Sequence, residues 1–234
     1  MRGRVLLIGL LALLALGLYG CDAGQGSGGV LGVPKVSQGW ARYGGDEDGF
    51  TLDAPSSWAK LDFSGADLDS AIQLMSASNE ALGTFLNNPT FKSQLNALTS
   101  SGVKLMLYDT LQDVSLTGFA TNINVVSVDV PDSLDLTQVM DSDIKQIESA
   151  LGSGLLTPVS KENVTLNGVP ALKLNYSYRI NLPTGDFIDA SLLQYGMVAA
   201  GKEYILTFTT TPEEQKLRSI TFDAIARKWR VFDR

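Results

Sequence analysis

The pair Asn167-Gly168 constrains the fold of this chain more than any other feature of its sequence. Asn-Gly is the dipeptide most favoured in two-residue β-hairpin turns, because both of its residues adopt positive φ angles. Residues 164–166 precede the pair, and residues 169–178 follow it with large apolar and polar side chains in alternation. The apolar members are Leu172, Leu174, Tyr176 and Tyr178. The sequence therefore predicts an antiparallel hairpin whose second strand is buried on one face.

Further strands are predicted on both sides of this hairpin, with helices between them. The strands cover residues 50–55, 103–108, 118–130, 187–198 and 204–209. Apolar residues at helical spacing predict a helical hairpin over 66–101 and a single helix over 136–151. A last helix is expected after Thr211, a natural N-cap, with Pro212 and Glu214 in its first turn. Its predicted contacts with the sheet are Leu217, Ile220, Ala224, Ile225 and Trp229.

This order of elements predicts an α+β fold. Long antiparallel strands covered by helices form a layered sandwich. The chain of 234 residues suits one domain with a sizeable core once its N-terminal segment is set aside. We expect a single domain with an antiparallel sheet flanked by helices. Its stability must come from packing, because Cys21 is the only cysteine and no disulfide can form within the chain.

Residues 1–20 have the pattern of a secretory signal peptide. Arg2 and Arg4 precede an apolar run over residues 5–18, and this run is too short to be a membrane-spanning helix. The small residue Gly20 stands directly before Cys21, at the place where such a peptide is cut. An ordinary signal peptide with a chance cysteine at this place is the alternative interpretation.

The segment Leu18-Tyr19-Gly20-Cys21 resembles the lipobox of bacterial lipoproteins. The resemblance implies that a peptidase cuts before Cys21 and that the Cys21 thiol carries a diacylglycerol, with palmitate as an acyl chain. It also implies a lipid anchor in the cell membrane, facing the periplasm or the cell exterior. Residues 21–45 are then the lipidated cysteine and a flexible Gly-rich tether, and residues 46–234 form the folded domain.

Two absences and the charge balance restrict the chemistry of the domain. The sequence contains no histidine, which excludes Ser-His-Asp and Cys-His catalytic sites and histidine-ligated metals. Acylation of Cys21 leaves no free thiol and no thiolate ligand. The net charge of −7 disfavours binding to nucleic acid or to anionic lipid. We therefore expect no cofactor, no metal site, no nucleic-acid partner and no enzymatic activity.

Two weaker patterns select no particular chemistry. Ser57-x-x-Lys60 has the spacing of a serine nucleophile with a lysine base, but the same spacing recurs from Ser101 and Ser142. Asp46-Glu47-Asp48 groups three carboxylates, but it lacks the alternating ligands, central glycine and distal glutamate of an EF-hand loop. A solvated loop is the expected place for this acidic run.

Five aromatic residues are candidates for a ligand groove, since pockets commonly place aromatic side chains at sheet faces. They are Trp58, Tyr176, Tyr178, Tyr195 and Tyr204. Burial in the core is the alternative for each of them.

Several segments of the predicted domain resemble the PsbP-like family, which includes proteins of the Mog/PsbP and the DcrB/LpqN types. The segments are 49–58, 118–125, 166–171, 201–209 and, as a terminal helix, 222–229. The resemblance extends over residues 49–232 and implies a PsbP-like α/β/α sandwich. Its motifs are packing and turn motifs, so it implies a fold more than an activity.

Three functions fit this sequence. The first is a non-enzymatic cell-envelope lipoprotein that acts as a binding or assembly accessory for another envelope component, with the membrane as a partner through the lipid on Cys21. The second is a carrier of an apolar or amphipathic ligand, with residues 66–101 as a lid over the sheet. The third is a hydrolase built on carboxylates or on Ser57 and Lys60, which the sequence favours least. The partner and the oligomeric state stay open.

Overall fold

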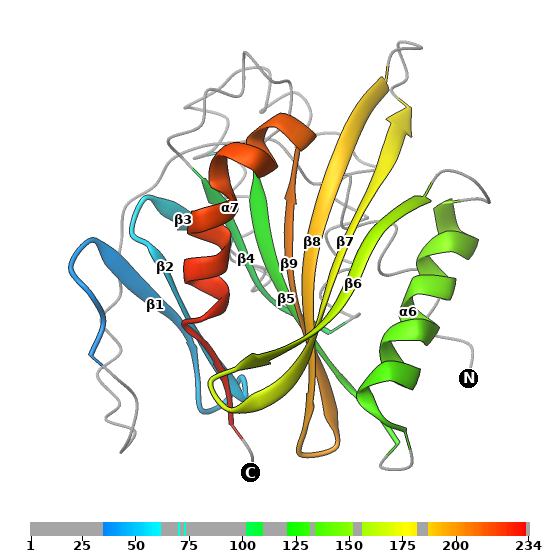
Figure 1. Cartoon of the computed structure of the whole chain (residues 1–234). Coiled ribbons are helices and arrows are strands. Elements are labelled where there is room, and N and C mark those ends of the chain that lie inside the picture. Colours follow the sequence, from blue (N-terminus) through cyan, green and yellow to red (C-terminus); the bar gives the residue numbers. More distant parts are fainter. Residues whose placement is uncertain are drawn as a thin grey trace.

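The structure is a computed structural model that describes residues 35–61, 70, 73, 102–109, 121–131, 134–151, 156–181 and 187–232. This part of the chain forms two antiparallel sheets and two longer helices (Figure 1). The strands are β1 (Trp40–Gly45), β2 (Phe50–Pro55), β3 (Trp58–Lys60), β4 (Val103–Asp109), β5 (Asn122–Asp129), β6 (Leu156–Leu166), β7 (Val169–Asn181), β8 (Phe187–Ala199), β9 (Lys202–Thr210) and β10 (Trp229–Val231). The helices are α6 (Leu136–Leu151) and α7 (Pro212–Ala226).

A seven-stranded sheet in the order β3-β4-β5-β9-β8-β7-β6 forms the centre of the domain, and each neighbouring pair is antiparallel. The predicted hairpin is confirmed, with Asn167 at φ 50° and Gly168 at φ 85° between β6 and β7. Both angles lie in the left-handed region that a type I′ turn requires. The β8–β9 turn repeats this geometry at Ala200 (φ 50°) and Gly201 (φ 69°).

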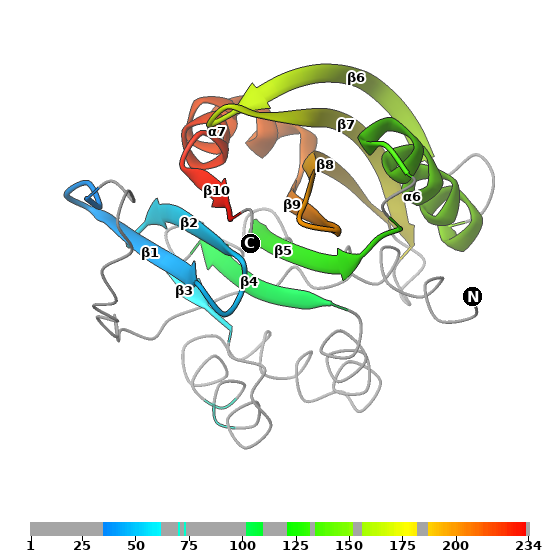
Figure 2. The same cartoon turned by 90° about the horizontal axis from the view of Figure 1, so that it is seen from below.

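The two faces of this sheet pack against different elements. On one face, called here the α7 face, the strands pack with β2, α7 and β10 in the larger apolar cluster. On the opposite face, the α6 face, α6 packs against a smaller cluster on β7 and β8 that includes Leu172, Leu174 and Leu192. Figure 2 shows the curved sheet between these layers. The structure thus confirms the predicted α+β sandwich in a single domain.

The helix predicted over residues 136–151 is confirmed as α6, and its start has a reciprocal cap. The Gln138 amide donates to Asp135 Oδ1 at 2.8 Å, and the Asp135 amide donates to Gln138 Oε1 at 3.0 Å. This is the capping-box arrangement, which satisfies amides that have no partner inside the helix. In its second turn, Met140 lies directly over Gly196 of β8, where an added Cβ atom would overlap the Met140 side chain. Gly196 is therefore required for the close approach of α6.

The last helix begins as predicted, but its orientation differs from the prediction. The Glu214 amide donates to Thr211 Oγ1 at 3.3 Å, which confirms Thr211 as the N-cap. The side chains of Leu217 and Ile220, predicted to contact the sheet, are 77% and 83% exposed. Their predicted contact is wrong, because the buried residues of α7 are Phe222, Ile225 and Ala226. Trp229 is buried as predicted, but in strand β10 instead of the helix.

The sequence did not predict a second sheet, in the order β1-β2-β10. Strand β1 pairs with β2 from Trp40↔Pro55 to Gly45↔Phe50, so the folded domain begins before residue 46 and includes residues expected as tether. Arg42 on β1 binds the buried Asp53 of β2 through two contacts, Nε–Oδ1 at 2.6 Å and Nη2–Oδ2 at 2.8 Å. A bidentate pair of this kind fixes the register of the two strands.

Several expectations lie outside the described residues. They concern the signal peptide over 1–20, the lipidated Cys21 and, apart from residues 70 and 73, the helical hairpin over 66–101. Neither α6 nor α7, nor any other helix in the described ranges, has the length and apolar composition needed to cross a bilayer.

Candidate functional site

The five aromatic residues predicted to line one groove lie on two faces of the sheet. Trp58, Tyr195 and Tyr204 belong to the cluster on the α7 face, and Tyr176 and Tyr178 belong to the cluster beneath α6. All five side chains are buried. The prediction of a common groove is therefore wrong, and core packing explains most of their aromatic surface.

The residues of the hydrolase hypothesis lie on a turn and a short strand instead of one helix face. Ser57 lies in the turn before β3, and Lys60 is exposed at the end of that strand. Side chains three residues apart meet on a helix but not along an extended chain. The acidic run 46–48 occupies the turn between β1 and β2. Within the described ranges, no three Asp, Glu or Cys side chains are grouped closely enough to hold a metal ion.

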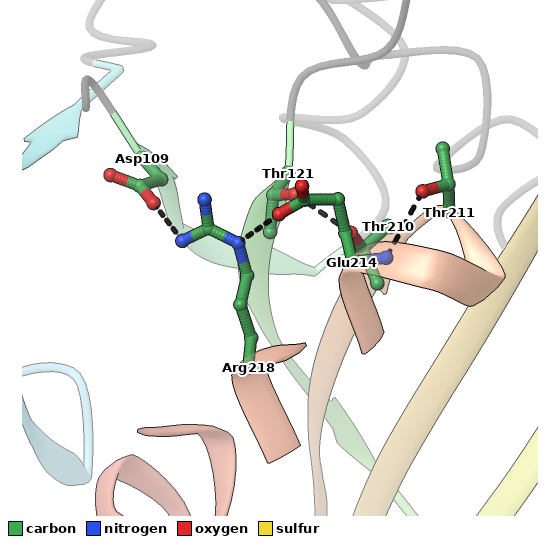
Figure 3. Close-up of polar contacts among 6 residues, drawn as sticks. All are labelled: Asp109, Thr121, Thr210, Thr211, Glu214 and Arg218. Carbon is green, nitrogen blue, oxygen red and sulfur yellow. Dashed lines mark hydrogen bonds and ion pairs between the residues drawn. The ribbon is translucent and has the colours of Figure 1, made fainter. Parts of the chain in front are cut away.

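Polar contacts fix the first half of α7 to the sheet (Figure 3). Arg218 lies between two carboxylates. Its Nη1 donates to Oδ2 of Asp109 at the end of β4, and its Nε donates to Glu214 Oε2 at 2.5 Å. Asp109 is buried, so its charge depends on this guanidinium for compensation. Beside it, the hydroxyls of Thr121 and Thr210 share a hydrogen bond of 2.7 Å between β5 and β9.

Two further residues of α7, Gln215 and Asp223, also contact the sheet. Gln215 accepts a hydrogen bond from Ser191 of β8, and its Nε2 donates to Asn175 Oδ1 at 3.1 Å. Asp223 accepts from Tyr195 Oη at 2.8 Å and from Lys173 Nζ at 3.2 Å. Burial raises the pKa of Tyr195 above its usual value, and the hydrogen bond to Asp223 adds to this shift. These contacts set the rotation of α7 about its own axis.

That rotation turns two large aliphatic side chains outward. Leu217 and Ile220 are one helical turn apart, so they lie side by side on the outer surface of α7. Exposed polar residues flank them, namely Glu213, Lys216 and Ser219. This pair is called the α7 apolar pair here. Because an apolar surface with a polar rim is typical of an interaction site, the pair is a candidate for partner binding.

The α6 face of the sheet contains an unexpected group of buried polar residues. In strand register, Asn124 of β5 lies opposite Thr207 of β9, which lies opposite Gln194 of β8. One row further, Asn122 lies opposite Thr209. These five side chains, called the polar patch here, are at most 3% exposed. On the α7 face, by contrast, the same strands place only apolar residues at the intervening positions, such as Ile123, Val125, Leu206 and Phe208.

Several polar atoms on this face have no hydrogen-bond partner among the residues that the structure describes. Gln194 Nε2 donates to Thr207 Oγ1 at 3.0 Å. Both amide atoms of Asn124 and the hydroxyl of Thr209 are buried without a partner, and so are the hydroxyls of Tyr176 and Tyr178 on β7. Burial raises the pKa of both tyrosines, with Tyr178 and Asp143 adding to the shift at Tyr176, so both hydroxyls stay protonated.

The sequence contained a signal for this patch that the prediction did not use. Asn122 and Asn124 alternate with Ile123 and Val125, which predicts a strand with one apolar face and one polar face. In a half-buried strand the polar face contacts water. Here β5 is buried on both faces, and only the tertiary structure reveals it.

Comparison with known proteins supports the fold. No protein-family model and no curated protein matches this chain. Among solved structures, cyanobacterial PsbP from Synechocystis sp. PCC 6803 matches with a TM-score of 0.54 and 17% identity, over 88% of this chain and 99% of that one. This match shows that the domain has a PsbP-like fold.

Two further structures match with lower scores. The Ran-binding protein Mog1p of Saccharomyces cerevisiae matches with a TM-score of 0.48 and 9% identity, over 84% of this chain and 97% of that one. LpqN of Mycobacterium tuberculosis, described as involved in cell envelope biogenesis, matches with a TM-score of 0.44 and 13% identity, over 78% of this chain and 83% of that one.

Proposed function

We propose that this protein is a lipid-anchored accessory of the cell envelope whose PsbP-like domain binds a protein partner and catalyses no reaction. The observation that carries the proposal is the α7 apolar pair, Leu217 and Ile220, on a helix whose other side is fixed to the sheet. A rigidly held helix that exposes two adjacent aliphatic side chains can insert them into a partner at little conformational cost.

The N-terminal sequence supports the membrane anchor. The basic start, the short apolar run and the segment Leu18-Tyr19-Gly20-Cys21 together favour lipidation of Cys21 after export. The two acyl chains of a diacylglycerol on Cys21 would bury enough methylene groups to hold a protein at a bilayer without electrostatic help. That agrees with the net charge of −7, which would weaken binding to anionic lipid.

The roles of three carboxylates, two of them buried, support a binding domain over an enzyme. Asp53 is paired with Arg42 and Asp109 with Arg218, so each holds two elements of the fold together. Asp223 similarly joins α7 to β7 and β8. General acid–base catalysis needs a carboxyl group that can reach a substrate, and these three are engaged in docking.

The α7 apolar pair also indicates the chemistry of the partner. Lys216 and Glu213 beside it carry opposite charges, so the rim favours no strongly charged surface. We expect a protein with an apolar depression surrounded by polar groups, since complementary interfaces have an apolar centre and a polar rim.

A comparison of three forms of the full-length protein tests this proposal. The forms are the wild type, the double variant L217S/I220S and the matched control K145S, which changes an exposed residue of α6. Each is isolated from detergent-solubilised envelopes, and the proteins bound to it are quantified. We expect one envelope protein to be recovered with the wild type and with K145S and to be reduced at least tenfold with L217S/I220S. Equal recovery with all three forms would refute the assignment of α7.

A Cys21→Ser form tests the anchor separately. We expect the wild type to fractionate with membranes and to carry acyl chains on its N-terminal peptide, as measured by mass spectrometry. The Cys21→Ser form should lose both properties. Membrane association that persists in this form would contradict the lipid anchor while leaving the role of α7 untouched.

A further inference from the structure

The polar patch, defined above as Asn122, Asn124, Gln194, Thr207 and Thr209, is not explained by the proposed partner surface on α7. It lies on the face of the sheet opposite to α7, and the residues that intervene along its strands, such as Ile123 and Phe208, are apolar and face α7. Apolar side chains in place of Asn124 and Thr209 would leave no polar atom there unsatisfied. A buried polar group without a partner destabilises a fold, so the patch is costly unless something else satisfies it.

The unpartnered atoms occupy neighbouring positions of the sheet. Thr209 pairs in register with Leu192 of β8, which pairs with Tyr176 of β7. Asn124 lies one row away from Thr209 on the adjacent strand. One face of the sheet therefore presents four unpartnered groups, namely the Asn124 carboxamide and the hydroxyls of Thr209, Tyr176 and Tyr178. The carboxamide and the hydroxyls can each both donate and accept hydrogen bonds.

The chemistry of these atoms restricts what could satisfy them. None of the five patch residues carries a charge, and both tyrosines are neutral at physiological pH. A buried anion or cation needs an opposite charge beside it, and the five patch residues and the two tyrosines supply none. Asp143 of α6, whose charge acts on Tyr176, already has an interaction partner of its own. The hydroxyl groups of a ligand, in contrast, both donate and accept hydrogen bonds. They can therefore pair with the donors and with the acceptors of carboxamide and hydroxyl side chains.

We propose that the polar patch, together with Tyr176 and Tyr178, is a binding site for an uncharged, hydroxyl-rich small molecule such as a sugar. Asn124 would hold two hydroxyls through its amide nitrogen and oxygen, Thr209 a third, and the tyrosines would contact the rest of the ligand. A site built on groups that must be hydrogen-bonded discriminates strongly against ligands that lack the matching hydroxyls. A free sugar and the sugar headgroup of a glycolipid share this chemistry.

Four probes test the charge and the source of the ligand. Methyl glucoside, gluconate and glucosamine are similar in size but neutral, anionic and cationic, and hexyl glucoside adds a short apolar chain to the neutral head. Binding to the full-length chain is followed through the NMR signals of the Asn124 side-chain amide. We expect the neutral probes to shift these signals with at least tenfold higher affinity than the charged ones. Tighter binding of hexyl glucoside than of methyl glucoside would assign the ligand to a glycolipid, and equal binding to a free sugar.

Variants of the patch provide the second measurement. Asn124→Leu and Thr209→Val replace unpartnered polar groups by apolar ones of similar shape, and Thr165→Val is the matched control at an exposed position of β6. We expect both patch variants to raise the melting temperature of the ligand-free protein and to abolish binding of methyl glucoside, with no effect in the control. Variants that lower the melting temperature would show that internal water already satisfies the patch. That result, or unchanged probe binding by the variants, or no binding of either neutral probe, would overturn the proposal.

Discussion

Arg218 on α7 binds Asp109 at the end of β4, although 109 positions separate them in the chain. The contact joins the last helix to a strand near the far edge of the seven-stranded sheet, and Glu214 holds the guanidinium from one turn earlier. This arrangement sets which side of α7 faces the core, and it therefore determines that Leu217 and Ile220 are presented to solvent.

Replacement of Arg218 by Met should destabilise the fold strongly. The change removes the cation beside the buried Asp109, and breaking such a pair from one side costs about 3–5 kcal/mol. Arg218 is itself partly exposed, so we expect the lower end of this range. Urea unfolding measures it. The double variant R218M/D109N should be more stable than R218M alone, and additive effects would show that the two residues are not coupled.

Gly196→Ala should destabilise the packing of α6. The new methyl group would overlap Met140, which is fully buried and has little room to move, so we expect a loss of about 1–3 kcal/mol. The double variant G196A/M140A should recover part of this loss relative to Gly196→Ala alone, because it removes the Met140 side chain from the clash. A Gly196→Ala protein as stable as the wild type in urea would contradict the close approach of α6.

Ala200→Asn should stabilise the protein. Ala200 has φ 50° in the β8–β9 turn, an angle that is unfavourable for alanine and common for asparagine. We expect a gain of about 0.5–1 kcal/mol in the free energy of unfolding, measured by urea titration. Gly201→Ala is the opposite test, since Gly201 has φ 69°, and it should be destabilising. A destabilised Ala200→Asn protein would argue against a type I′ turn.

Stability should fall steeply above about pH 10, because burial raises the pKa of four tyrosines. They are Tyr108, Tyr176, Tyr178 and Tyr195. Each keeps its proton in the folded state and loses it on unfolding, so its stabilising contribution is complete below about pH 10 and is lost at about 1.4 kcal/mol per pH unit above it. Absorbance at the tyrosinate band, followed with circular dichroism, should show these tyrosines ionising together with unfolding. Full ionisation in a folded protein would contradict their burial.

The sequence predicts best where a local signal and the tertiary structure agree. Asn167-Gly168 defined the β6–β7 hairpin because its turn geometry needs no distant contact. Apolar spacing likewise defined α6 from Leu136 to Leu151. Strand β10 was missed because it has only three residues and its pairing with β2 joins segments far apart in the chain. Strand β1 was missed because its residues were assigned to the Gly-rich tether, although it pairs with the next strand along the chain.

The candidate sites depend on information that the sequence pattern does not contain. The apolar residues of α7 form more than one possible stripe, and the choice depends on the contacts of Arg218, Gln215 and Asp223 with other elements. The alternation in β5 assigned Asn122 and Asn124 to one face but could not show that this face is buried. Periodicity states which residues lie together, and tertiary packing decides what covers them.

The most direct measurement of the proposed function is photo-crosslinking from the outer face of α7 in intact cells. A photoreactive amino acid replaces Leu217 or Ile220 in the lipid-anchored protein, and a third form carries it at the exposed Lys145 of α6. We predict that positions 217 and 220 crosslink to the same envelope protein, that position 145 does not, and that Cys21→Ser reduces the yield. No crosslinked protein from α7, or the same products from position 145, would contradict the account.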